Sequence, residues 1–374
     1  MIMPRVTFVY SGGREARWAR SDATDEPSEF FYGATELHRE GWTVKVVDFI
    51  DQPRSVAAAL LNAIIGRILP VRVRAEHLIG AWSLRHILRD TDVIIASTSY
   101  IALAIEILRA LGMRLPPVVA IHCGIANHSP SYIRQRVSSC LLGRQQSIFF
   151  AAAEAAETAR IFSLSDSCVH ANAFGVDSSY WTPPDQNRSR RYILSVGNDA
   201  RRDYATLAQA AGGWNIPVKI LTKRDIPGPI PPNVELLNGS WHSPAVTDSE
   251  LRELYRGAAA VVIPLIDSAQ PSGQSVALQA MACGCPVVMS RTSGLWTGDD
   301  FIDGEHIRLV CFGSAAALGG AVQELLDRPD LAAAMGSNAA SRVKLRGDIA
   351  GFAVRLKPVI LKAAAWQIDN SAVV

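Results

Sequence analysis

Short apolar runs rich in valine and isoleucine recur along the chain, and polar segments with helical spacing separate most of them. Runs of this length without alternation are typical of parallel strands, which are buried on both faces. We predict strands at residues 6–10, 44–49, 93–97, 118–122, 148–151 and 169–173, then at 192–196, 218–222, 234–237, 259–263, 287–290 and 307–310. Helices are expected between and after them, among others at 30–39, 101–111, 315–326, 331–335 and 352–366. This alternation favours an α/β protein with doubly wound parallel sheets.

Residues 55–89 do not follow this alternation of apolar strands and helices. Six apolar residues recur there at helical spacing and form one stripe: Leu60, Leu61, Ile64, Ile65, Ile68 and Leu69. The charges around the stripe are almost all arginine: Arg54, Arg67, Arg72, Arg74, Arg85 and Arg89, opposed by Glu76. This composition is typical of a helix lying on a membrane surface, and equally of an amphipathic helix packed on its own domain. The run is too short to span a bilayer.

The length of 374 residues suits two domains of similar size. A polar, proline-bearing segment at 182–189 is the best linker between the two series of strands. We therefore expect an N-terminal domain at 1–181, a second domain at 182–350 and a C-terminal helical segment at 351–374. Two such sheets joined by one linker leave a cleft between them.

Composition excludes several classes of function. The net charge is only +2, and the arginine-rich segment has no interleaved aromatic residue apart from Trp82, so we expect no nucleic-acid partner. Asp90 and Asp92 precede their strand, at the wrong edge for a ligand site, and Cys283 and Cys285 lack a second pair, so no metal site is expected. No secretory leader precedes the first strand, so the cytoplasm is the expected location, peripheral to a membrane if the 55–89 segment binds one.

The stretch from Ala258 to Ser290 has the order strand, glycine-containing loop, helix, strand. Its loop, residues 271–275, has the composition of a turn. The helix that follows carries few polar side chains and ends at Gly284. The N-terminus of such a helix directs unpaired backbone N–H groups at an anion. We therefore expect a phosphate group at this loop.

Other candidate residues follow strands at their carboxyl ends, where ligands of open parallel sheets bind. Arg202 stands just before a predicted helix start in the second half, which suits a diphosphate, although an exposed arginine paired with a helix-cap aspartate is an equal alternative. In the first half, Gly12-Gly13 follows the first strand and His122 ends the fourth. A tight turn and a structural histidine are the simpler interpretations of these two.

Three motifs together resemble retaining GT-B glycosyltransferases of the glycosyltransferase-4 type: Phe174-Gly175-Val176-Asp177 followed by Trp181, Val196-Gly197 with Arg202, and the run from Leu278 to Val288. The similarity is sharp over roughly residues 170–310. It implies two facing Rossmann-like domains with a cleft between them, a nucleotide diphosphate-sugar held mainly by the second, acceptor recognition mainly by the first, and a last helix that crosses back onto the first domain.

Carried over residue by residue, the resemblance implies a catalytic pair of His122 and Arg202, with the arginine on the diphosphate. Implied donor-binding residues are Gly12, Gly13, Asn198, Arg202, Ser272, Gly273, Gln274, Ser275 and Gln279. The chain departs from the family pattern where two glutamates are usual, because Pro271 and Gln279 stand there. Gln279 would still hydrogen-bond a ribose hydroxyl, and Ser272 or Gln274 would have to replace the lost carboxylate at Pro271. Asn198 stands where an arginine is common.

These features predict a glycosyltransferase that moves a sugar from a nucleotide diphosphate-sugar to a glycan, lipid-linked or small-molecule acceptor, with retention of configuration, without a metal and without a further cofactor. Its partners would be the donor, the acceptor and, through residues 55–89, a membrane surface. The alternatives are a nucleotide-sugar epimerase or phosphorylase on the same fold, and a non-catalytic nucleotide-sugar-binding or scaffolding protein. The substitutions at Pro271 and Gln279 motivate the last of these.

Overall fold

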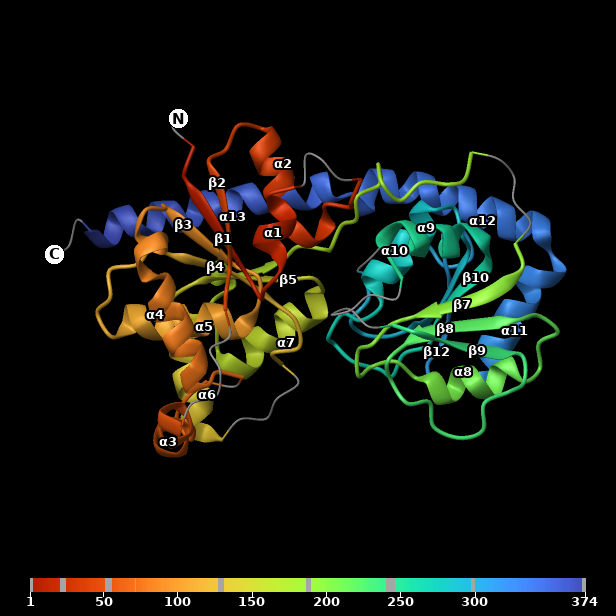
Figure 1. The fold of residues 1–374 in the computed structure, drawn as a ribbon, viewed down its shortest axis with the longest axis horizontal. Helices are drawn as coiled ribbons and strands as arrows, with labels where there is room; N and C mark the ends of the chain where they lie inside the picture. The colour runs from red at the N-terminus through yellow and green to blue at the C-terminus, as the bar shows by residue number, and fades with distance from the viewer. Residues whose placement is uncertain are drawn as a thin grey trace. The chain divides into compact units, whose positions relative to one another are not determined.

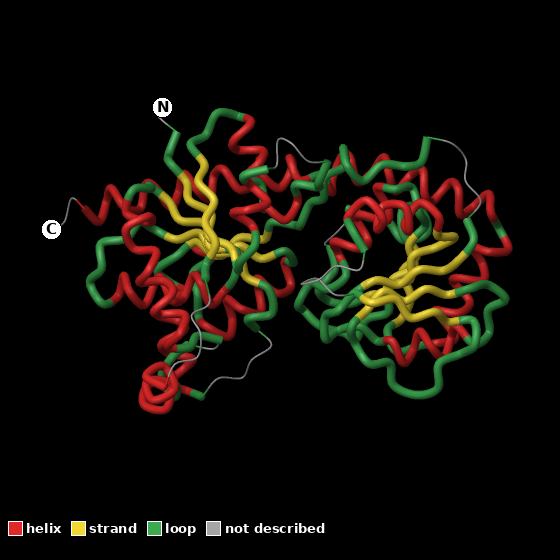
Figure 2. The backbone as a smooth tube through the Cα atoms, in the orientation of Figure 1, coloured by secondary structure: helices red, strands yellow, loops and turns green. Residues whose placement is uncertain are grey.

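The structure is a computed structural model that describes residues 3–20, 25–50, 56–70, 72–126, 131–185, 190–239, 246–296 and 300–371. The chain divides into two compact units. The first comprises residues 1–25, 30–173 and 352–374, and the second comprises 26–29 and 174–351. Each unit holds one parallel six-stranded sheet with helices packed against it (Figures 1 and 2). The two sheets confirm the expected α/β architecture.

The sheet of the first unit has the strand order β2-β1-β3-β4-β5-β6, with every neighbouring pair parallel. Its strands are β1 (Val6–Tyr10), β2 (Val44–Asp48), β3 (Val93–Ala96), β4 (Val118–His122), β5 (Gln146–Phe149) and β6 (Val169–Ala171). All six runs predicted as strands are strands, with ends displaced by at most two residues. Apolar runs buried on both faces are therefore a sufficient signal for these elements.

The helices of the first unit are α1 (Arg14–Trp18), α2 (Ala34–Arg39), α3 (Val56–Ile65), α4 (Ala75–Arg89), α5 (Ser99–Ala110), α6 (Tyr132–Leu142) and α7 (Ala152–Phe162). The helix predicted at 30–39 is shorter, because Tyr32 and Gly33 both have positive φ and separate a 3-10 turn at Glu29–Phe31 from α2. Residues 56–89 form two helices, and a left-handed Arg72 lies in the loop between them.

The sheet of the second unit has the order β12-β11-β10-β7-β8-β9 and is also fully parallel. Its strands are β7 (Tyr192–Val196), β8 (Val218–Thr222), β9 (Val234–Asn238), β10 (Ala258–Ile263), β11 (Val287–Arg291) and β12 (Arg308–Cys311). The chain winds outward from β7 in one direction and from β10 in the other. The switch point of this doubly wound sheet therefore lies between β7 and β10, where such folds bind ligands.

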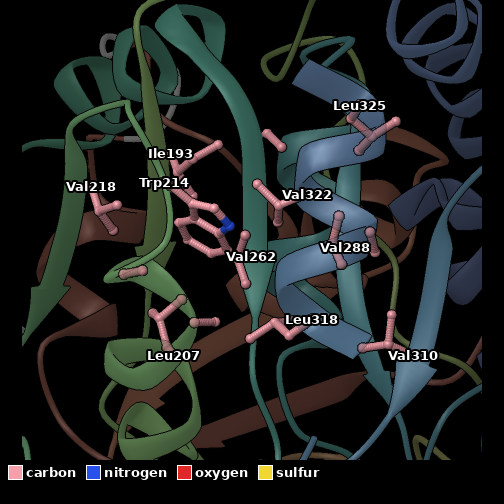
Figure 3. Close-up of a cluster of buried hydrophobic side chains, with 14 of the residues drawn as sticks. Ile193, Leu207, Trp214, Val218, Val262, Val288, Val310, Leu318, Val322 and Leu325 are labelled. Atoms are coloured by element: carbon pink, nitrogen blue, oxygen red, sulfur yellow. The ribbon is translucent and has the colours of Figure 1, made fainter. Parts of the chain in front are cut away.

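The second unit's helices are α8 (Tyr204–Ala211), α9 (Asp248–Gly257), α10 (Gln274–Ala282), α11 (Ala315–Asp327) and α12 (Pro329–Arg342), the last much longer than the predicted 331–335. On one face of the sheet, α8 and α11 cover a core that includes Trp214 and Val322 (Figure 3). Alternate strand residues, such as Val261 and Ile263, point to the other face, against which α9 and α10 pack. This arrangement fixes the N-terminus of α10 beside the switch point.

The last helix, α13 (Ile349–Ser371), begins in the second unit and continues in the first from Phe352 onward. In the first unit, Phe352 lies 6.2 Å from Phe150 between ring centroids. Arg355 Nε donates to Asn172 Oδ1 at 2.7 Å. Among the described residues, α13 and the other helices include none that is both long enough and apolar enough to cross a membrane.

Candidate functional site

Two loops meet at the switch point of the second sheet. One follows β7 at residues 197–203, and the other follows β10 at 264–273. Backbone hydrogen bonds tie them together: Asp203 N donates to Pro264 O at 3.0 Å, and Ile266 N donates to Arg201 O at 2.9 Å. The loops therefore present the predicted Arg202 and the predicted 271–275 segment on one edge of the sheet.

Arg202 is enclosed in this edge and is only 5% exposed. Its Nε lies 3.0 Å from Asp199 Oδ2. Neither Nε nor Nη1 has a hydrogen-bond partner of acceptable geometry among the described residues. A buried guanidinium that keeps unused donors is unusual, because each unpaired buried donor costs free energy. Arg202 is thus prepared to donate to a further acceptor.

Two glycines make room for this guanidinium. A Cβ atom added at Gly197 would lie 2.1 Å from Arg202 Nε, and one at Gly273 would lie 2.7 Å from Nη1. The Cβ at Gly273 would also meet Ile263 Cγ2 at 2.6 Å. Any side chain at these positions would displace the arginine, so the two glycines and Arg202 pack together as one cluster. We call Gly197, Arg202 and Gly273 the arginine cradle.

The N-terminus of α10 opens onto the arginine cradle. Gly273 is the N-cap residue, in a left-handed conformation with φ of 71°, and as a glycine it has no side chain to cap the helix. By helix geometry, the amide N–H groups of Gln274, Ser275 and Val276 have no partner within the helix. Ser272 Oγ donates to Asp199 Oδ1 at 2.6 Å. Aligned amides beside an arginine with unused donors are an arrangement that suits an anion, and the phosphate expected at this loop stays a prediction.

Gln274 lies at the first position of α10 but is turned away from the solvent. Its Nε2 donates to Gly294 O at 2.9 Å, and its Oε1 is buried without a hydrogen-bond partner among the described residues. The backbone of Gln274 therefore remains a candidate anion donor, whereas its side-chain amide is partly committed to the 294 loop.

The structure places Gln279 away from any open surface. This side chain is 4% exposed, and both ends of its amide are occupied. Tyr255 Oη donates to Oε1 at 3.1 Å, and Nε2 donates to Glu29 Oε1 at 2.9 Å. The expectation that Gln279 hydrogen-bonds a ribose stays a prediction, and in this structure its amide is engaged with buried protein partners.

The side-chain amide of Asn198 is also engaged with the protein at both ends. Its Nδ2 donates to Gly239 O at 2.5 Å, and its Oδ1 accepts from Lys223 N at 2.7 Å. The side chain thus ties the end of β7 to the loops after β8 and β9. The donor-binding role that the resemblance implies for Asn198 stays a prediction, and in this structure its amide groups are engaged with the protein.

His122 ends β4 as predicted, but it has no solvent exposure. Its Nδ1 lies 2.8 Å from Ser99 Oγ, and its Nε2 lies 3.0 Å from Gln145 Nε2. Burial, with a smaller contribution from the charge of Arg72, lowers the pKa of His122 to about 3. The expectation that the side chain faces an open cleft is therefore corrected: His122 is a buried, neutral imidazole with both nitrogens partnered.

Gly12 and Gly13 lie in an exposed turn after β1, with φ of 75° and 76°. The backbone conformation explains why glycine is needed there, since neither added Cβ would meet any atom within 4 Å. The first amides of α1 are already capped, because Arg14 N and Glu15 N donate to Asp48 Oδ1 at 2.9 and 3.1 Å. The simpler interpretation, a tight turn, accounts for this loop, and its predicted role in donor binding stays a prediction.

A cavity of about 790 Å³ lies at the opposite edge of the second sheet. It is bordered by the start of β10 at Ala259 and by Gly284, Arg190 and Lys344. Ligands of open parallel sheets bind at the carboxyl edge, so this cavity is not the candidate site. Among the described residues, no three His, Cys, Asp or Glu side chains gather as a metal site.

Three further residues organise the site; Gly197 was named within a sequence motif, but neither Asp199 nor Glu29 was singled out from the sequence. Asp199 holds both Arg202 and Ser272, Gly197 makes space for the guanidinium, and Glu29 is the partner of Gln279. Gly197 was detectable as a glycine directly after a buried strand. Nothing local marks Glu29, which is 250 residues from its partner.

Comparison with known proteins shows which family and which folds this chain is similar to. Residues 230–328 match the family described as "Glycosyl transferases group 1". A D-inositol 3-phosphate glycosyltransferase of Acidothermus cellulolyticus is 39% identical over 85 residues, which is 23% of this chain and 18% of that relative. The aligned part therefore spans less than a fifth of the relative's length.

Solved structures resemble nearly the whole chain. Sucrose-phosphate synthase from Thermosynechococcus elongatus superposes with a TM-score of 0.69 at 17% identity, covering 96% of this chain and 99% of that one. Anabaena HepE in complex with UDP and glucose gives a TM-score of 0.65 at 14% identity, covering 94% and 98%. Identities this low establish a shared fold, with two Rossmann-like sheets.

Proposed function

We propose that this chain is a GT-B glycosyltransferase of group 1, which transfers a sugar from a nucleoside diphosphate-sugar to an acceptor hydroxyl. The observation that carries the proposal is the arginine cradle beside the N-terminus of α10. The second unit would hold the donor and the first unit would recognise a glycan, lipid-linked or small-molecule acceptor. We also propose that the reaction retains configuration and needs no metal.

The chemistry of the reaction matches this arrangement of charge. When the anomeric bond breaks, negative charge develops on the leaving nucleoside diphosphate, and donors already aimed at that charge lower the barrier. Arg202 would supply a permanent positive charge through Nη1, while the amides of Gln274 and Ser275 would supply oriented dipoles. No side chain of the loop needs to change its protonation state for this role.

A uridine nucleotide is the first donor to test. Solved structures of HepE, which shares the fold, contain UDP and UDP-glucose. For this chain the donor is a proposal, because the identity to HepE is only 14%. The acceptor is left open between the three classes named above.

We expect one nucleoside diphosphate-sugar to raise the midpoint of thermal unfolding of this protein, because a ligand that binds only the folded state stabilises it by mass action. At a ligand concentration of 100 times Kd the gain is about 2.7 kcal/mol. The measurement is a thermal-shift panel of UDP-, GDP- and ADP-sugars with the free nucleotides as controls. Incubation of the stabilising sugar with acceptor pools then tests transfer.

The panel and the incubations together also separate the transferase from the alternative functions. Turnover of a nucleotide-sugar without an acceptor would indicate an epimerase, and dependence on inorganic phosphate would indicate a phosphorylase. Saturable binding with no transfer to any acceptor would support a non-catalytic binding protein, which the proline at position 271 motivates. Failure of every nucleotide to shift the unfolding midpoint would contradict the donor site itself.

A second proposal concerns the surface of α3 and α6 in the first unit. The predicted apolar stripe divides between two faces: Ile65 and Leu69 pack inward, whereas Leu60 and Ile64 are 62% and 75% exposed. Arg134 Nε of α6 donates to Leu69 O at 2.9 Å, which joins the start of α6, with exposed Tyr132 and Ile133, to the segment that follows α3. We call Leu60, Leu61, Ile64, Ile68, Tyr132 and Ile133 the apolar patch.

The charges around the apolar patch are basic. Arg136 is exposed on α6, and Arg67 is exposed in the turn that follows α3. The acidic residue of 56–89, Glu76, is buried and accepts a hydrogen bond from Asn62. Exposed apolar side chains next to uncompensated arginines suit an anionic lipid surface. We therefore propose that this patch docks the enzyme on an anionic membrane, which would favour a lipid-linked acceptor.

The double substitution Leu60→Ser/Ile64→Ser is expected to reduce binding to anionic vesicles several-fold, because it removes apolar area that would enter the interface. Co-sedimentation with equimolar phosphatidylglycerol and phosphatidylcholine vesicles measures this, with pure phosphatidylcholine as the neutral comparison. Leu111→Ser is the control, since Leu111 is also strongly exposed but lies at the end of α5. Equal binding by the wild type to both vesicles, or equal loss in the control, would refute docking through the patch.

A further inference from the structure

Glu29 is a buried carboxylate that the proposed reaction does not use. It lies in the segment 26–29, which groups with the second unit although the residues around it in sequence belong to the first. Its side chain has no solvent exposure and carries three hydrogen bonds. Oε1 accepts from Trp181 Nε1 at 2.8 Å and from Gln279 Nε2 at 2.9 Å, and Oε2 accepts from Asp177 N at 3.3 Å.

Gln279 is a hydrogen-bond donor to this carboxylate. It lies on α10, and its other amide atom accepts from Tyr255 Oη on α9. An amide at 279 can donate to Glu29 and accept from Tyr255 at the same time. A carboxylate at 279 would face the carboxylate of Glu29 inside the protein, and two buried like charges in contact are strongly unfavourable. The residue at 29 therefore explains why 279 is glutamine.

The segment 26–29 is fixed to the second unit by further contacts. Ser28 Oγ donates to Asp177 Oδ2 at 2.9 Å, and Ser28 N donates to the same atom at 3.2 Å. Asp177 also caps the turn that leads to Trp181, whose backbone N–H donates to Asp177 O at 2.9 Å. Glu29 thus joins the turn before the linker to helix α10 through Gln279, and Gln279 in turn accepts from Tyr255 of helix α9.

We propose that Glu29 and Gln279 are a complementary carboxylate–amide pair, in which Glu29 positions helix α10 so that its N-terminus stays beside Arg202. This inference rests on the proposed donor site for its functional consequence. The pairing itself depends only on the contacts within the second unit.

The pairing makes stability depend on pH. Burial raises the pKa of Glu29 to about 7, against the hydrogen bonds from Gln279 and Trp181, which lower it. The folded state therefore holds a proton that the unfolded state loses near pH 4.5, and stability falls as pH rises through this window. The titratable groups facing Glu29 are Asp177 and Tyr255. Burial acts to raise the pKa of Asp177, but hydrogen bonds from Ser179 and Ser28 bring it below its usual value. Burial raises the pKa of Tyr255, so its phenol stays neutral.

The test is an exchange of the two side chains. Thermal unfolding of the full chain is measured at pH 5.5 and pH 8 for the wild type, E29Q, Q279E and the double variant E29Q/Q279E. We expect Q279E to lower the unfolding midpoint more at pH 8 than at pH 5.5, because one of the two adjacent carboxylates accepts a proton at the lower pH. The double variant, which restores one carboxylate and one amide, is expected to unfold at a higher temperature than Q279E.

A double variant no more stable than Q279E, or a Q279E loss equal at both pH values, would overturn the pairing. If Q279E does not fold, a folded double variant supports the pairing and an unfolded one refutes it. UDP-glucose is then added to each folded variant, and recovery of its half-saturating concentration in the double variant tests the effect on α10. If UDP-glucose shifts no protein, including the wild type, the donor proposal fails while the stability comparison still decides the pairing.

Discussion

Replacement of Arg202 by alanine is expected to lower kcat/KM for the donor by about 10²- to 10³-fold, the range found when one preorganised charge-stabilising donor is removed. The guanidinium is buried, and its Nη1 has no protein partner among the described residues, so its loss would fall on the ligand. Most of the effect should appear in kcat, since the negative charge on the leaving diphosphate is larger in the transition state. Steady-state kinetics with varied donor measure the division between kcat and KM.

Arg328→Ala is the matched control for this substitution. Arg328 is an exposed arginine of the same unit that faces Glu324 at 3.8 Å, and surface pairs of this kind contribute little. Its kinetic constants should remain close to those of the wild type. A fall in kcat/KM below about fivefold for Arg202→Ala, in a protein that unfolds at the wild-type temperature, would remove Arg202 from the catalytic site.

The fold was predictable because its elements have local causes. All twelve predicted strands are present, and a central one such as Val118–His122 is fully buried, as an uninterrupted apolar run predicts. The errors lie at helix ends and have equally local causes. Tyr32 adopts a positive φ, which the sequence does not signal for a tyrosine, and this shortens the helix expected at 30–39.

The candidate site was predictable only in part. Arg202 and the 273–275 loop follow two strands that neighbour each other at the switch point, so position along the chain was enough to bring them together. Whether a side chain is free for a ligand depends on partners far away in sequence. His122 meets Gln145, Asn198 meets Gly239 and Gln279 meets Glu29, and no local pattern announces these contacts.

The second large effect is expected from Gly273→Ala. The new Cβ would lie 2.6 Å from Ile263 Cγ2 and 2.7 Å from Arg202 Nη1, so either α10 or the guanidinium has to move. Ile263 is fully buried, and Gly197 closes the other side of the guanidinium. Neither α10 nor the guanidinium can therefore move freely. We expect a loss of about 1–3 kcal/mol of stability from overpacking, added to the cost of the left-handed backbone, and loss of the donor-induced thermal shift.

Gly313→Ala separates the two contributions. Gly313 has φ of 68°, close to the 71° of Gly273, but a Cβ there would meet no atom within 4 Å. Both variants therefore carry the same backbone strain of about 1–2 kcal/mol, and only Gly273→Ala disturbs the arginine cradle. Chemical denaturation should show the larger loss in Gly273→Ala, and Gly313→Ala should keep the donor-induced shift. Equal losses in the two variants, with the donor shift intact in both, would mean that Gly273 is needed only for its backbone conformation, so that Arg202 does not depend on the cradle.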